Sequence, residues 1–159
     1  KGLAGVVLRH DQEPRRAALG RDLARLCRAR RLRLVVAGDP RLAAALGAGV
    51  HLRGGRWAAG APVLVRRRVG ALVTSSAHGA AELRRAARAG ADLAFLSPAF
   101  ATRSHPDATV LGPLRWGRFS RGAPLPVAAL GGISGVSLRR LPRGLCRAVG
   151  AIEALGEAG

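Results

Sequence analysis

Short apolar runs recur along the chain, and helix-like or loop sequence follows each of them. The apolar runs predict seven β-strands, over residues 3–8, 32–37, 49–52, 71–75, 93–96, 127–130 and 148–152. Helical spacing of apolar residues predicts helices over residues 13–30, 40–46, 79–90, 113–119 and 137–141, and a weak one over 63–68. Apolar strands that alternate with helices are typical of a parallel sheet.

Two of these helices begin at recognisable signals. Pro40 follows Gly38 and Asp39 and suits the first turn of a helix. Gly79, with Glu82 three residues later, has the spacing of a helix start, and Gly90 has the character of a helix stop.

Two closures of such a sheet compete. One is an open doubly wound sheet, and the other is a TIM (β/α)₈-type barrel. Seven strands in 159 residues are few for a barrel, which usually needs at least about 200 residues. A missing first βα unit would explain both the strand count and the start at Lys1. We therefore expect a single barrel domain over residues 1–159, with a homo-oligomer as one way to fill an open barrel.

Composition narrows the class of protein. A hydrophobic fraction of 48% is high for a disordered chain. No apolar run approaches the roughly 18 residues of a membrane span, and no secretory signal is recognisable. The two cysteines, Cys27 and Cys146, are too few for a disulfide framework or a four-ligand zinc site. These features lead us to expect a cytoplasmic protein that does not enter a membrane.

The chain is strongly basic, with 27 Lys and Arg against 9 Asp and Glu, and a net charge of +18. Such a charge invites a nucleic-acid interpretation. However, Lys1 is the only lysine, and the arginines are spread along a chain dominated by Gly, Ala, Leu, Arg and Pro. Aromatic residues, which would stack on bases, make up only 3%. This distribution favours a compositional bias and a solvated basic surface over a nucleic-acid site.

Polar residues and glycines follow the predicted strands, where both closures place their ligands. These residues are His10, Asp11, Asp39, His51, Ser75, Ser76, His78, Ser97, Thr102, Ser104, His105, Gly131 and Gly132. Gly131 and Gly132 follow a late strand, and their amides can approach a phosphate, although two glycines also suit a plain tight turn. Thr102 and Ser104 are either anion ligands or ordinary loop hydroxyls.

The histidines and carboxylates allow further chemistry. His78, near Ser76, is a candidate general acid or base, and a capping or core role is the alternative. His10 and His51 are interpreted as structural. No close ligand spacing supports zinc. Asp39 is the one well-placed carboxylate for Mg²⁺.

Several segments together resemble the thiamine phosphate synthase/TenI family, from about Val6 to Ile152. They are GAGVHL (47–52), SSAHGAAEL (75–83), AGADLAFLSPAFATRSH (89–105) and PVAALGGI (126–133). The resemblance implies a TIM barrel whose synthases join a hydroxymethylpyrimidine pyrophosphate to a thiazole phosphate with Mg²⁺ and release pyrophosphate. A tautomerase branch isomerises the thiazole phosphate with a histidine.

The resemblance also implies roles for individual residues. Arg9 matches an arginine on the pyrophosphate side, and Asp39 matches a Mg²⁺ ligand. Ser76 and His78 match an SxH segment in which His78 takes the place of the tautomerases' catalytic histidine. On the phosphate side, the matching residues are Thr102, Ser104, Gly131 and Gly132, with His105 where the family has a lysine.

The departures from the family pattern gather at the pyrophosphate and metal end. Val7, Asp11 and Gly38 replace a glutamine, a lysine and an asparagine, and Glu153 replaces a late serine. The stretch from Arg53 to Arg56 lacks the second metal aspartate. The resemblance nevertheless implies coupling to thiamine phosphate first, because that is the main reaction of the family. Thiazole tautomerisation by His78 is the first alternative, and a non-catalytic binder of phosphates or nucleic acid is the second.

Overall fold

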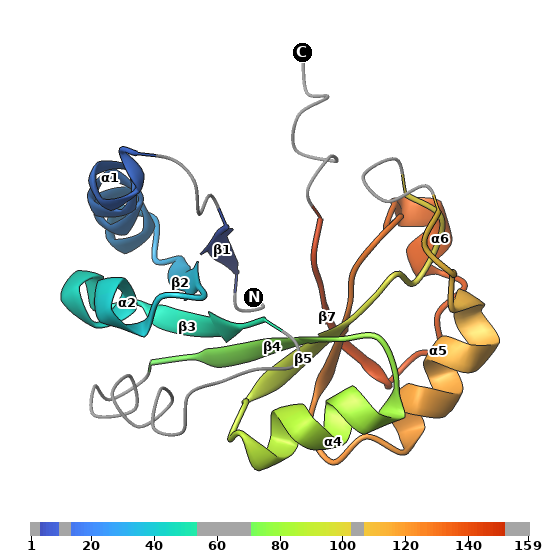
Figure 1. Ribbon diagram of the computed structural model, residues 1–159. Helices are drawn as coiled ribbons and strands as arrows, with labels where there is room; N and C mark the ends of the chain where they lie inside the picture. Colours follow the sequence, from blue (N-terminus) through green and yellow to red (C-terminus); the bar gives the residue numbers. More distant parts are fainter. Residues whose placement is uncertain (1–3, 10–13, 54–70, 103–106, 152–159) are drawn as a thin grey trace. The chain divides into compact units, whose positions relative to one another are not determined.

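The protein is described by a computed structural model over residues 4–9, 14–53, 71–102 and 107–151 (Figure 1). Strands and helices alternate: β1 (Gly5–Leu8), α1 (Arg16–Ala29), β2 (Arg33–Ala37), α2 (Pro40–Leu46), β3 (Gly49–Leu52), β4 (Val73–Ala77), α4 (Ala80–Arg88), β5 (Leu93–Leu96), α5 (Gly112–Arg121), β6 (Val127–Ala129), α6 (Gly135–Leu138) and β7 (Cys146–Val149). They form two compact units, Lys1–Ser75 with Ala89–Ala91, and Ser76–Arg88 with Asp92–Gly159. A single domain over residues 1–159 stays a prediction.

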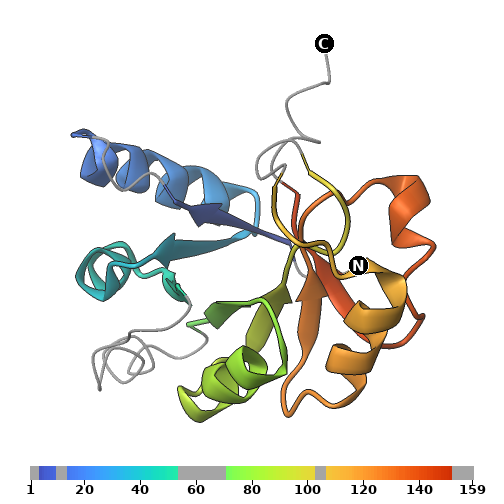
Figure 2. The same cartoon turned by 45° about the vertical axis from the view of Figure 1, so that its right-hand side comes forward.

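In the first unit, β1, β2, β3 and the start of β4 pair in parallel and in chain order. Val36 lies beside Val50, and Val50 lies beside Val73. Helices α1 and α2 pack on these strands (Figure 2). Ala24 and Cys27 of α1 belong to the same buried cluster as the strand residues. Burial of these side chains supplies most of the stability of this unit.

In the second unit, β5, β6 and β7 again pair in parallel and in chain order. Trp116 of α5 is fully buried, and its indole Nε1–H donates to the Leu96 carbonyl over 3.2 Å. The last residue of β4, Ala77, also belongs here, because its carbonyl accepts from the Ser97 amide at 3.0 Å. In a doubly wound sheet the order of the strands reverses around the first strand. In both units described here, each strand instead pairs with the next strand along the chain, which is the order of a (β/α)₈ barrel.

Two predicted boundaries near the C-terminus are wrong. The helix predicted over 137–141 lies at Gly135–Leu138, because the Ser134 and Ser137 side chains each accept a backbone N–H at its start. The strand predicted over 148–152 lies at Cys146–Val149. Half-buried and exposed residues alternate along it, so it lacks the continuous apolar run on which the prediction rested. The weak helix predicted over 63–68 falls outside the described residues.

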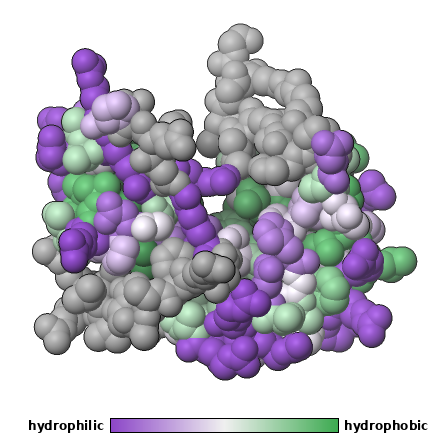
Figure 3. Space-filling view, in the orientation of Figure 1, coloured by the Kyte–Doolittle hydropathy of each residue, from purple (hydrophilic) through white to green (hydrophobic). Residues whose placement is uncertain are grey.

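Many of the basic residues in the described part of the chain lie on the outer faces of helices. Hydrophilic side chains cover much of the visible surface (Figure 3). The exposed arginines of α1 and α4 are Arg21, Arg25, Arg28, Arg84, Arg85 and Arg88. In the described part of the chain, no helix has the length and apolar character that crossing a membrane requires.

Candidate functional site

The predicted site residues that the structure describes fall into two groups, one in each unit. Arg9 and Asp39 belong to the first unit, and the remaining residues belong to the second: Ser76, His78, Thr102, Gly131 and Gly132. Ser104, His105 and His10 lie outside the described residues. Each group lies at or just beyond the carboxyl ends of its own strands.

The glycine loop after β6 packs directly on the segment after β5. The Phe100 amide donates to the Gly131 carbonyl at 3.0 Å, and the Ala99 amide donates to the Leu130 carbonyl at 2.8 Å. Gly131 and Gly132 have φ values of +89° and +62°. A Cβ on Gly132 would lie 2.2 Å from the Ala101 carbonyl oxygen. Glycine is therefore required here on both conformational and steric grounds.

This packing places the two predicted phosphate elements next to each other. Thr102 directly follows Ala101, the residue that closes on Gly132. Below the loop, the Ser137 hydroxyl donates to the Gly132 carbonyl at 2.8 Å. The sequence analysis missed the role of Ser134 and Ser137. Their three-residue spacing is the signal of a capping box and would have identified them.

His78 is held by groups on both sides of β4's end. Its backbone amide donates to Glu82 Oε2 at 2.7 Å, and its ring Nδ1 lies 2.8 Å from the Ser97 carbonyl oxygen. A carbonyl only accepts, so Nδ1 carries the proton of the neutral ring. Nε2 then has the lone pair and is the atom that can take a proton. Ser97, which orients the ring, was given no role from sequence, although it directly follows the neighbouring strand.

Asp39 is engaged by the protein itself. Its Oδ1 accepts from the Leu42 amide at 2.9 Å, as the N-cap of α2, and Pro40 occupies the first turn. Its Oδ2 lies 4.0 Å from Nη1 of Arg16, whose side chain is only 15% exposed. Arg16 also donates to the Ala37 carbonyl. This geometry gives Asp39 a structural role that is sufficient to explain its presence.

Among the described residues, Asp39 and its neighbours do not form a Mg²⁺ site by themselves. Magnesium takes oxygen ligands in near-octahedral geometry. Within residues 4–9, 14–53, 71–102 and 107–151, no three His, Cys, Asp or Glu side chains come together in a way that could hold a metal ion. Asp39 offers a single carboxylate with a guanidinium beside it, and that positive charge opposes a second cation.

The cap predicts different outcomes for two substitutions of Asp39. Asp39→Ala removes the acceptor for Leu42 and is expected to lower the free energy of unfolding by about 1 kcal/mol. Asp39→Asn keeps a good N-cap and is expected to stay within a few tenths of a kcal/mol of the parent. Denaturant unfolding of the three proteins measures this. An asparagine variant as unstable as the alanine variant would show that the contact with Arg16, and not the cap, is what stabilises the fold.

His51 is buried at the carboxyl end of β3. It is 8% exposed, and its Nδ1 lies 2.9 Å from Thr74 Oγ1. Burial, together with the positive charges of Arg9 and Arg53, lowers the pKa of His51 to about 4. The ring is therefore neutral at pH 7, in agreement with the structural role predicted for it. Arg53 is fixed by a hydrogen bond from its Nη2 to the Arg9 carbonyl at 3.1 Å.

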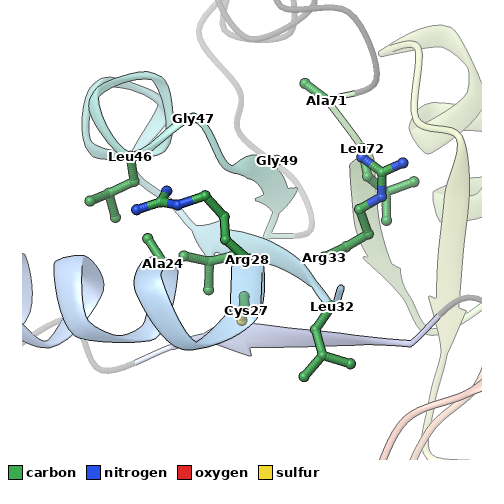
Figure 4. Close-up of a pocket in the computed structure, with 11 residues that line it drawn as sticks. Ala24, Cys27, Arg28, Leu32, Arg33, Leu46, Gly47, Gly49, Ala71 and Leu72 are labelled. Atoms are coloured by element: carbon green, nitrogen blue, oxygen red, sulfur yellow. The ribbon is translucent and has the colours of Figure 1, made fainter. Parts of the chain in front are cut away.

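A cavity of about 170 Å³ lies elsewhere in the first unit (Figure 4). It opens between the C-terminal ends of α1 and α2 and the start of β2, and it is lined by Cys27, Arg28, Arg33, Leu46 and Gly49, among others. It contains none of the predicted site residues. The cavity lies at the amino ends of the strands. In folds of this type, residues at that end contribute to stability, and ligands bind at the carboxyl ends.

A family model and two relatives matched by sequence agree with one another on the family that this chain resembles. A family model described as thiamine monophosphate synthase matches residues 1–155. The chain is similar to a thiamine-phosphate synthase of Geobacillus thermodenitrificans, with 36% identity over 146 residues, and to one of Geobacillus kaustophilus, with 34% identity over 149 residues. Each alignment covers 89% of this chain and 64% of the relative. The chain thus spans a little under two thirds of the length of these relatives.

Solved structures resemble the fold. A thiamine phosphate pyrophosphorylase from Pyrococcus furiosus matches with a TM-score of 0.81 and 24% identity, over 99% of this chain and 76% of that one. A structure described as native KDPGal matches with a TM-score of 0.66 and 18% identity, over 99% of this chain and 74% of that one. Together with the sequential strand order, these likenesses confirm the predicted α/β fold of the TIM-barrel type.

Proposed function

Since the chain belongs to the thiamine monophosphate synthase family, we propose that it couples hydroxymethylpyrimidine pyrophosphate with a thiazole phosphate. In this transferase reaction, the thiazole nitrogen forms a bond to the methylene carbon of the pyrimidine, and the bond from that carbon to the pyrophosphate oxygen breaks. The products are thiamine phosphate and pyrophosphate. The observation that carries the proposal is the packing of the Gly131–Gly132 loop on the segment that leads into Thr102.

The thiazole phosphate is proposed to bind at this loop. Glycines without a Cβ allow a phosphate to approach the backbone, and amides in this kind of turn can point at an anion. Gly131 and Gly132 supply the amides in this proposal, and Thr102 supplies a hydroxyl donor. Ser104 and His105 are proposed to extend the same contact, and Ser76 stands at the neighbouring strand end.

The chemistry also needs positive charge where pyrophosphate departs. Negative charge accumulates on the leaving oxygen as the bond breaks, and each positioned cation or donor lowers the barrier. Loss of one such contact typically costs about 10²–10³ in rate. Arg9, directly after β1, is proposed to contact the pyrophosphate.

Tautomerisation of the thiazole phosphate is a second candidate, favoured by the geometry of His78. The Ser97 carbonyl fixes the proton on Nδ1 and leaves Nε2 as the base. A held substrate and one oriented acid/base group are sufficient for such a proton transfer.

One experiment separates these functions. The purified protein is mixed with both precursors and Mg²⁺, and thiamine phosphate and pyrophosphate are measured. We expect both products in equal amounts, and we expect Thr102→Val to raise the KM for the thiazole phosphate about tenfold, because one charge-assisted hydrogen bond is lost. Absence of product would overturn coupling. Metal-independent proton exchange on the thiazole phosphate that disappears in His78→Ala would then establish tautomerisation.

A further inference from the structure

Three successive carbonyl groups of the glycine loop after β6 each accept a hydrogen bond. The Leu130 and Gly131 carbonyls accept from two backbone amides of the segment after β5, at 2.8 and 3.0 Å. The Gly132 carbonyl accepts from the Ser137 hydroxyl at 2.8 Å, and no other described residue donates to it. The orientation of this third carbonyl therefore depends on one side chain.

The orientation of a carbonyl also fixes that of the next amide. In a trans peptide unit, the C=O and the following N–H point in opposite directions. The Ile133 amide therefore points away from Ser137. Within the described part of the chain, the amides of Gly131, Gly132 and Ile133 donate to no other group. Successive amides in a turn can bind an anion, so Ile133 offers a third donor beside the two glycines.

The single proton of the Ser137 hydroxyl is directed to Gly132. The Gly132 carbonyl oxygen, at 2.8 Å, is nearer to Ser137 Oγ than the Ser134 carbonyl oxygen, at 3.3 Å. The Ser134 amide donates to Ser137 Oγ over 2.8 Å and so occupies one of its lone pairs. Ser137 is half-buried and belongs to the capping box that starts α6. The protein alone therefore orients this hydroxyl, before a ligand binds.

This contact matters because Gly132 is a glycine. Without a Cβ, the residue has access to a wide range of backbone angles. The peptide unit between Gly132 and Ile133 is then free to rotate unless a neighbouring group restricts it. The hydrogen bond from Ser137 supplies that restriction. A donor that is oriented in advance loses less conformational freedom when a ligand binds, and this raises affinity.

We propose that Ser137 is a positioning residue: its hydroxyl fixes the Gly132 carbonyl and thereby directs the Ile133 amide at the phosphate of the thiazole substrate. The inference rests on the binding of the thiazole phosphate at the glycine loop that is proposed above. Ser137 itself makes no contact with the phosphate in this arrangement. The phosphate takes no part in the bond that forms, so it is bound equally in the ground state and the transition state. Ser137 therefore acts on KM and not on kcat.

The sequence makes the Ile133 amide easy to observe by NMR. The chain has two isoleucines, Ile133 and Ile152, so isotope labelling of isoleucine nitrogen gives two backbone amide signals. Ile152→Val shows which signal belongs to Ile133. The full chain is titrated with inorganic phosphate, and we expect the Ile133 signal to move until the site is saturated. In Ser137→Ala, half-saturation is expected to need about tenfold more phosphate, because a hydrogen bond to a charged group is weakened.

Two further variants distinguish positioning from general stability. Ser137→Thr keeps the hydroxyl and is expected to restore phosphate binding to within about threefold of the parent. Ser134→Ala removes the side chain that accepts from the Ser137 amide, but it keeps the backbone donor to Ser137 Oγ. It is expected to lower the melting temperature as Ser137→Ala does, yet to weaken phosphate binding by less than about threefold.

The coupling assay gives a second readout. Ser137→Ala is expected to raise the KM for the thiazole phosphate about tenfold and to leave kcat unchanged. Circular dichroism melting shows whether each variant is folded. An Ile133 signal that does not move with phosphate would overturn the proposal. A folded Ser137→Ala variant that binds phosphate as tightly as the parent would also overturn it, as would equal weakening in Ser134→Ala and Ser137→Ala.

The outcome can be separated from that of the proposed function. An Ile133 response that depends on Ser137, without formation of thiamine phosphate, would leave the positioning role standing and remove the coupling reaction. Formation of thiamine phosphate with the same KM for the thiazole phosphate in the parent and in Ser137→Ala would have the reverse meaning.

Discussion

Gly132→Ala is expected to abolish detectable binding of the thiazole phosphate and to lower the free energy of unfolding by about 2–4 kcal/mol. Gly132 has φ of +62°, where an L-residue with a Cβ is strained. The new methyl group would also meet the Ala101 carbonyl oxygen at 2.2 Å and the Phe100 Cβ at 2.8 Å. A carbonyl oxygen of the backbone cannot rotate away as a flexible side-chain end can. The glycine loop and the segment before Thr102 must therefore separate.

Gly135→Ala is the matched control. No atom lies within 4 Å of a Cβ at Gly135, its φ is outside the left-handed region, and it occupies the first position of α6. Alanine there is expected to leave stability unchanged or to raise it by up to about 1 kcal/mol. Denaturant unfolding and titration with the thiazole phosphate measure both variants. If Gly132→Ala still bound within twofold of the parent, the loop would not form part of the phosphate site.

The parts of the fold that follow from sequence are those with local signals. The helix over residues 40–46 was predicted to the residue, because Pro40 marks its first turn and Gly47 adopts the left-handed conformation at its end. The strand over residues 93–96 was likewise predicted correctly, because its apolar run is short and sharply bounded. By contrast, β7 alternates between half-buried and exposed residues and has no such run.

The candidate site likewise contains features that a sequence signal predicts and features that no such signal predicts. The proximity of Gly131 and Gly132 to the segment before Thr102 follows from the expectation that consecutive parallel strands are neighbours. The pairing of Asp39 with Arg16 does not follow, because it depends on how α1 packs and has no local sequence signal. The N-cap role of Asp39 did have a signal, an aspartate immediately before a helix that starts with proline. The role of Asp39 as a Mg²⁺ ligand, which the resemblance implies, stays a prediction beside this structural role.

Acidification from pH 7.5 to 4.5 is expected to lower the free energy of unfolding by about 2–3 kcal/mol through His51 alone. Burial and the nearby Arg9 and Arg53 lower the pKa of His51 to about 4 in the folded protein. In the unfolded chain the ring has its usual pKa of 6.5. Between these two values the unfolded chain binds a proton that the folded protein does not. Stability therefore falls as the pH drops from 6.5 to 4, and this contribution levels off below pH 4.

His51→Gln removes this contribution and is the variant that tests it. The loss of the contact with Thr74 is expected to reduce stability at pH 7.5, but the variant should lose about 2–3 kcal/mol less than the parent between pH 7.5 and 4.5. Carboxylates that titrate in the same range contribute equally to both proteins and cancel in the difference. Unfolding by denaturant at a series of pH values measures it. Parallel curves for the two proteins would mean that the His51 ring can be protonated in the folded state, and hence that burial and the charges of Arg9 and Arg53 together do not disfavour the charged ring.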